Sequence, residues 1–88
     1  DEVLQTEELA AELIRFLAAN YPGVLENKYT ITAAQDPYVM LGRIAESRHC
    51  LVRGNELDTE KAAMLLMDDF REGKLGRLTL EYPQTEEA

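Results

Sequence analysis

The stretch from Phe70 to Glu81, FREGKLGRLTLE, contains a Gly-Lys pair, and such a pair belongs to the commonest phosphate-binding loop of nucleotide-binding proteins. That loop needs a glycine, four further residues and then Gly-Lys-Ser/Thr, because the first glycine lets the backbone wrap the phosphates and the hydroxyl holds Mg²⁺. Here Asp68 stands where the first glycine is required, and Leu75 replaces the hydroxyl residue. We therefore interpret Gly73 and Lys74 as the end of a helix.

Cations are concentrated in the middle of an otherwise acidic chain of 88 residues. The net charge is −8: residues 1–42 carry seven acids and two cations, and residues 78–88 carry three acids and no cation. Between Arg43 and Arg77, seven cations face seven acids. Because clustered Lys and Arg supply the affinity of proteins for phosphates, only this middle stretch can form a basic patch. The candidate nucleic-acid-binding residues are Arg48, Arg53, Lys61, Arg71, Lys74 and Arg77.

Two of these cations have a second interpretation. Arg71 and Lys74 lie at the predicted end of a helix, where unpaired carbonyl groups carry partial negative charge. Cations there stabilise a helix by about 0.3–1 kcal/mol each. A role in stabilising the helix and a role in binding can coexist, so both remain open.

Catalytic and metal-binding groups are few. His49 and Cys50 resemble a catalytic dyad, but neighbouring side chains point apart and nothing supplies a third, orienting residue. Asp68, Asp69 and Glu72 lie on a predicted regular helix rather than on the flexible loop that Ca²⁺ prefers. One cysteine and one histidine are too few for a zinc site. We therefore expect no catalytic, cofactor or metal site, and we do not expect the chain to be an enzyme by itself.

The first predicted helix is capped by Thr6 and ends at Asn20-Tyr21-Pro22-Gly23. At about 100° per residue its apolar residues fill one face. They are Leu9, Ala10, Leu13, Ile14, Phe16 and Leu17. Phe16 and Phe70 are expected in the core, which leaves Tyr29 and Tyr38 as the aromatic residues for a binding role.

Two further helices have clear first residues. Asp36-Pro37 is a capping carboxylate followed by a proline, and Asp58 or Thr59 caps the last helix. A possible short helical segment covers 22–29. The buried stripes of the two longer helices are Met40, Leu41, Ile44 and Ala45, and Ala62, Ala63, Leu66, Met67 and Phe70.

After Gly76, alternating Leu78, Leu80 and Tyr82 predict a short extended segment, for which Cys50 to Val52 could be a partner strand. The fold class is therefore mainly α: a small bundle of three to four helices with a short extended C-terminal segment. We expect one domain over residues 1–83 and a disordered tail over 84–88. The start at Asp1 fits a piece of a larger protein.

No apolar run approaches the roughly 20 residues of a membrane span, so we expect no membrane partner. The single cysteine suits a reducing cytosol, which favours a cytoplasmic location.

Several segments together match a known block: Asp1 to Leu4 (DEVL), Glu8 to Ala10 (ELA), Tyr21-Pro22, Tyr29, Arg48 to Gly54 (RHCLVRG), Glu56 to Asp58 (ELD), Ala62-Ala63, Leu65-Leu66 and Asp69 to Arg77 (DFREGKLGR). With these segments the chain resembles the C-terminal domain of the ribosome biogenesis GTPase A (YlqF) family. Their order and spacing together are fairly specific and span nearly the whole chain. Glycine is common in that family where this chain has His49 and Asn55.

The resemblance implies a role in assembly of the large (50S) ribosomal subunit. Members are cytoplasmic GTPases with a circularly permuted G domain, in which GTP and Mg²⁺ bind. The domain that this chain resembles follows the G domain, and it would dock on ribosomal RNA or on the precursor particle and couple docking to GTP hydrolysis. The six candidate cations would contact RNA, and the G domain of the same protein would be a second partner.

Two alternatives stay open. The chain could be a helix-turn-helix nucleic-acid-binding module, with 36–48 and 58–73 as the helix pair, although Asp68, Asp69 and Glu72 would repel DNA phosphates from the last helix. It could also be a purely structural protein–protein interaction domain. The oligomeric state stays open as well.

Overall fold

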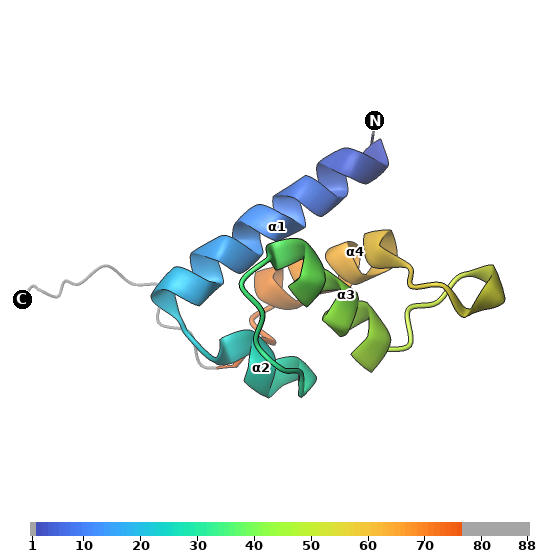
Figure 1. Ribbon diagram of the computed structural model, residues 1–88. Helices are drawn as coiled ribbons and strands as arrows, with labels where there is room; N and C mark the ends of the chain where they lie inside the picture. Colours follow the sequence, from blue (N-terminus) through green and yellow to red (C-terminus); the bar gives the residue numbers. More distant parts are fainter. Residues whose placement is uncertain (1, 77–88) are drawn as a thin grey trace, which may run out of the picture.

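The structure, a computed structural model, describes residues 2–76, which fold into four α-helices and one short 3₁₀ turn (Figure 1). The elements are α1 (Glu2–Asn20), α2 (Val24–Tyr29), α3 (Pro37–Ser47), η1 (Arg53–Asn55) and α4 (Thr59–Arg71). The prediction of a mainly α fold with three to four helices is confirmed. The predicted extended segment from Leu78 to Tyr82, the end of the 1–83 domain and the tail over 84–88 lie outside the described residues.

The starts of the helices test the predicted caps. Asp36 Oδ1 accepts the backbone N–H of Tyr38 at 2.9 Å, and Asp58 Oδ1 accepts that of Lys61 at 3.0 Å. Both carboxylates satisfy helical N–H groups that otherwise have no partner, as predicted. Thr6 lies inside α1, which starts at Glu2, so its predicted capping role is wrong.

Replacing Asp36 with alanine removes the cap of α3 and should lower the free energy of unfolding by about 1 kcal/mol. In a domain of this size that corresponds to a melting temperature lower by roughly 4–8 °C. Thermal unfolding followed by circular dichroism measures the shift. Gln35→Ala, a change in the preceding exposed residue, is the control and should leave the melt nearly unchanged; equal shifts for both variants would contradict the capping role.

Helix α1 buries only part of the predicted apolar face. Ala10, Ile14 and Leu17 are almost fully buried, whereas Leu9 and Phe16 are 59% and 44% exposed. The prediction that Leu9 and Phe16 belong to the core is therefore wrong. Apolar residues cover more than half of the circumference of α1, so their period alone does not select the buried side. Packing against both α3 and α4 selects the side with the small alanine, which allows close approach.

The core lies where α1 crosses α3 and α4, which also pack on each other (Figure 1). Its largest fully buried side chains are Leu17, Tyr29, Leu41, Ile44 and Leu66. The predicted buried residues of α3 are confirmed, as are Ala62, Ala63 and Leu66 of α4, while Met67 and Phe70, also predicted in the stripe of α4, are only half-buried. Tyr29 of α2 is 1% exposed, so its predicted availability for binding is wrong. Tyr38 is exposed.

Between α3 and α4, residues 48–58 form a short arm that projects from the helices (Figure 1). Leu51 and Leu57 form an isolated antiparallel bridge, and the N–H of Val52 donates to the carbonyl oxygen of Glu56 at 2.8 Å. Residues Cys50 to Val52, which the sequence suggested as a partner strand for the C-terminal segment, thus pair with other residues of the arm.

His49 and Asn55 of the arm have left-handed backbones, with φ values of 56° and 64°. Glycine adopts this conformation without the steric cost that a Cβ imposes.

Candidate nucleic-acid interface

The C-terminus of α4 determines what the Gly-Lys pair does. Gly73 has a φ of 73°, its N–H donates to the carbonyl oxygen of Phe70 at 3.2 Å, and the N–H of Lys74 donates to that of Asp69 at 2.8 Å. These two bonds form a Schellman motif, in which a left-handed glycine ends the helix. The interpretation of the pair as a helix end is confirmed.

Two candidate cations at this end form exposed ion pairs. Arg71 pairs with Asp68, and Lys74 Nζ lies 3.1 Å from Glu72 Oε1. The hydrogen bond to Glu72 raises the pKa of Lys74, so the ammonium stays charged throughout the physiological range. All four side chains are more than half exposed. Exposed pairs contribute about 0–1 kcal/mol, so both cations can exchange a carboxylate for a phosphate at small cost.

Arg48 has a structural role at the junction of three helices. Its Nη2 donates to the carbonyl oxygen of Lys28 at 3.1 Å, and its guanidinium lies 4.9 Å from the centre of the Tyr29 ring. The Tyr29 hydroxyl in turn donates to Asp69 Oδ2 at 2.7 Å, which joins α2 to α4. Burial, followed by the hydrogen bond to Asp69, raises the pKa of Tyr29. Arg48 thus holds α2 in place while remaining exposed.

Lys28 is a candidate that the sequence analysis missed. A shallow groove between α2 and the turn after α4 is lined by Lys28 and Lys74, together with Val24, Asn27, Leu75 and Gly76. Arg48 reaches the same corner through its bond to the Lys28 carbonyl. Lys28 is one of only two cations in residues 1–42, where no cluster was expected, so its position beside Lys74 becomes visible only in the fold.

The other candidates lie elsewhere. Arg53 is in η1 at the tip of the arm, and Lys61 is in the first turn of α4. The 13 residues of α4 span about 20 Å. Lys61 and Arg71 therefore lie near opposite ends of this helix. Arg77 lies outside the described residues. The described candidates therefore form two groups, one at each end of α4, rather than one continuous patch.

The outer face of α4 does not favour the helix-turn-helix interpretation. Its exposed residues are Lys61, Met64, Asp68 and Arg71. A helix that enters the major groove of DNA needs a face that can approach phosphates and base edges. Asp68 lies in the middle of this face and opposes such an approach.

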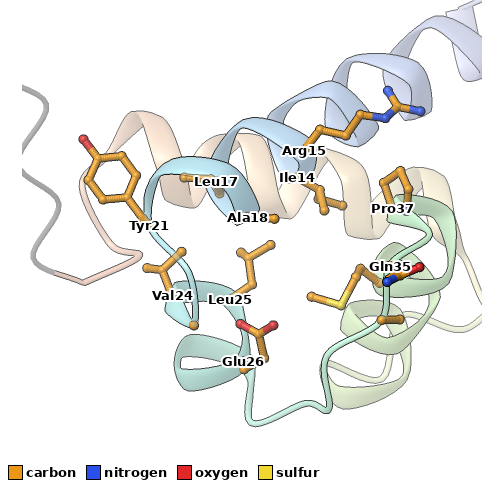
Figure 2. Close-up of a pocket in the computed structure, with 13 residues that line it drawn as sticks. Ile14, Arg15, Leu17, Ala18, Tyr21, Val24, Leu25, Glu26, Gln35 and Pro37 are labelled. Atoms are coloured by element: carbon orange, nitrogen blue, oxygen red, sulfur yellow. The ribbon is translucent and has the colours of Figure 1, made fainter.

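The dyad candidates point in different directions: Cys50 is buried and His49 is exposed. Within residues 2–76, no group of His, Cys, Asp or Glu side chains could hold a metal ion. A cavity of about 50 Å³ between α1, α2 and the start of α3 is lined mainly by apolar side chains such as Ile14, Leu25 and Met40 (Figure 2). It is a small, partly open pocket at the edge of the core and brings no nucleophile and base together.

In the described part of the chain, no helix combines the length and the hydropathy needed to cross a membrane.

The chain is similar to curated bacterial proteins that all carry the name Ribosome biogenesis GTPase A. It is 32% identical to the protein of Bacillus cereus over 85 residues, which cover 96% of this chain and 29% of the relative. It is 31% identical to the protein of Priestia megaterium over 88 residues, or 99% of this chain and 31% of the relative. The chain thus spans about 30% of the length of these relatives. No family model and no solved structure matches it.

Proposed function

Because the chain belongs to the ribosome biogenesis GTPase A family, in which it corresponds to the C-terminal domain, we propose that it docks a GTP-binding protein on the precursor of the large (50S) ribosomal subunit. The docking takes place in the cytoplasm and uses ribosomal RNA as the main contact. GTP and Mg²⁺ bind in the larger part of the protein that precedes this domain. This domain contributes particle binding and couples it to hydrolysis in that part.

The observation that carries the proposal is the grouping of Lys28 and Lys74 in one groove, with Arg48 beside them and Arg71 at the same end of α4. Cations of this kind position a protein on phosphates without reading base sequence. Arg53 and Lys61 at the other end of α4 form a second, smaller contact. Because the net charge is −8, the domain alone binds weakly, and the rest of the protein supplies further affinity.

The charge-reversal double variant Lys28→Glu/Lys74→Glu tests the first contact. In the longer protein, it should weaken cosedimentation with purified precursor particles at least about tenfold and lower the slope of log affinity against log salt by roughly 1–2. Lys74 is exposed and Lys28 is half-buried, each near a helix end, so the thermal melt should change little.

The matched control is Arg15→Glu on α1, compared with the single variant Lys74→Glu, which makes the same charge change. Arg15→Glu should reduce binding less than Lys74→Glu, because Arg15 lies outside both groups of candidates. Equal losses would mean that net charge alone determines binding. Unchanged, salt-insensitive binding of the first variant would favour a purely protein–protein interaction domain, and a preference for duplex DNA would favour the helix-turn-helix alternative.

A further inference from the structure

An apolar surface extends from α3 to the arm. It consists of Tyr38, Val39, Gly42, Leu51 and Leu57, and its four large side chains are each between 42% and 44% exposed. Leu57 Cδ1 lies 3.8 Å from the point that a Cβ of Gly42 would occupy, and Leu51 is its bridge partner. Tyr38 and Val39 lie one turn before Gly42 on α3. We refer to these five residues as the α3–arm surface.

Gly42 has no conformational reason to be glycine. It lies inside α3 and has no positive φ, and a Cβ would make only an ordinary contact with Leu57. Glycine in the interior of a helix destabilises it relative to alanine, because more backbone freedom is lost on folding. The missing side chain therefore keeps the α3–arm surface flat, which allows something outside the domain to approach closely.

The chemistry of this surface fits a protein. None of its five residues is charged, so it cannot neutralise phosphates, and its exposed leucine, valine and tyrosine side chains are typical of the centre of a protein–protein interface. It thus differs from the lysine-lined groove at the other end of α4.

The position of the arm indicates which protein. Thr59 Oγ1, directly after the arm, donates to Glu7 Oε2 at 2.7 Å, which places the base of the arm beside the first turns of α1 (Figure 1). In this family, the larger part of the polypeptide precedes the C-terminal domain and enters it at this end of α1. We propose that the α3–arm surface is the docking surface for the preceding GTPase part of the same polypeptide, an inference that rests on the proposed function.

Hydrogen–deuterium exchange on the longer protein and on this 88-residue chain tests the proposal without any ribosomal particle. Amides of residues 38–42 and 51–57 should exchange about tenfold or more slowly in the longer protein. Residues 64–68 of α4, whose exposed side chains Met64 and Asp68 lie on the outer face of the helix, are the internal control and should exchange equally in both. The proposal would be overturned if amide exchange on the α3–arm surface were equally fast in both proteins, or if only residues 64–68 exchanged more slowly in the longer protein.

Leu57→Lys in the longer protein should abolish the slowing, whereas Met64→Lys, the same change at an exposed residue of α4, should not. Gly42→Ala should raise the melting temperature of the 88-residue chain by about 3–8 °C and reduce the slowing in the longer protein. If Gly42→Ala raises the melting temperature but amide exchange in the longer protein is slowed as much as before, Gly42 is not needed to keep the α3–arm surface flat for its partner.

Other occupants give different results, and each would overturn the proposal. A second copy would make the 88-residue chain dimeric in analytical ultracentrifugation, and Leu57→Lys would make it monomeric. A particle component would slow exchange only after particles are added. The proposed function can also fail separately. If the longer protein does not bind particles but its exchange is still slowed, docking on the particle is wrong and the contact between the two parts of the polypeptide stands.

Discussion

Replacing Leu66 with alanine is expected to lower the free energy of unfolding by about 2–5 kcal/mol. Leu66 is fully buried in the core cluster of α1, α3 and α4. Its truncation removes three carbon atoms from a closely packed site and leaves a cavity, since the helices around it can collapse only in part. A domain of this size has a total stability of roughly 4–13 kcal/mol, so the loss is a large fraction of the whole.

Urea unfolding followed by circular dichroism measures this change as a shift of the midpoint. Met64→Ala is the matched control on the same helix, because Met64 is 52% exposed and its truncation should cost less than about 1 kcal/mol. A similar cost for the two variants would contradict the orientation of α4. Loss of cooperativity in the Leu66 variant would still support burial, because it indicates loss of the single core.

Tyr29→Phe is expected to cost about 1–3 kcal/mol although only one oxygen atom is removed. The lost hydrogen bond leaves Asp69 Oδ2 without its tyrosine donor in a half-buried position between α2 and α4. Tyr38→Phe is the control, because Tyr38 is exposed and forms no such bond among the described residues. Chemical unfolding at pH 7 compares the two variants with the parent chain.

The pH dependence of this pair gives a second measurement. Because burial raises the pKa of Tyr29 in the folded state above its ordinary value of 10.0, the folded chain keeps a proton that the unfolded chain releases. The contribution of Tyr29 to stability is therefore complete below about pH 10 and falls as the pH rises above it. The parent chain should lose more stability between pH 9 and pH 11 than Tyr29→Phe does. Equal losses would show that groups common to both chains, and not Tyr29, are responsible.

Local rules predicted the ends of the helices well. Asp36, Asp58 and Gly73 act at the positions expected of them, because caps depend on a few neighbouring backbone groups that the residue types indicate. The buried stripe of α3 was also predictable, since its polar residues leave a narrow apolar face. In α4 the prediction holds for Ala62, Ala63 and Leu66, whereas Met67 and Phe70 are half-buried. Helix α1 was less predictable, because its apolar face is wide enough for either Ala10 or Leu9 to point inward.

The candidate site was predictable as a set of residue types but not as a surface. Sequence showed which cations exist and that Gly73 and Lys74 end a helix. It did not show that Arg48 packs on Tyr29 or that Lys28 lies beside Lys74. These two contacts join segments far apart in the chain, so no local pattern predicts them. The pairs of Arg71 with Asp68 and of Lys74 with Glu72 are local, since their partners are only three and two residues apart.

By itself, therefore, the amino-acid sequence determined the helices, the N-caps of α3 and α4 and the family, because each depends on the identity and spacing of residues along the chain. Only the tertiary structure decided which side of α1 is buried, that Tyr29 lies inside, and that the cations are divided between the two ends of α4. The physical reason is that burial and charge clustering depend on distances between segments far apart in the chain, and the packing of α1 against α3 and α4 sets those distances.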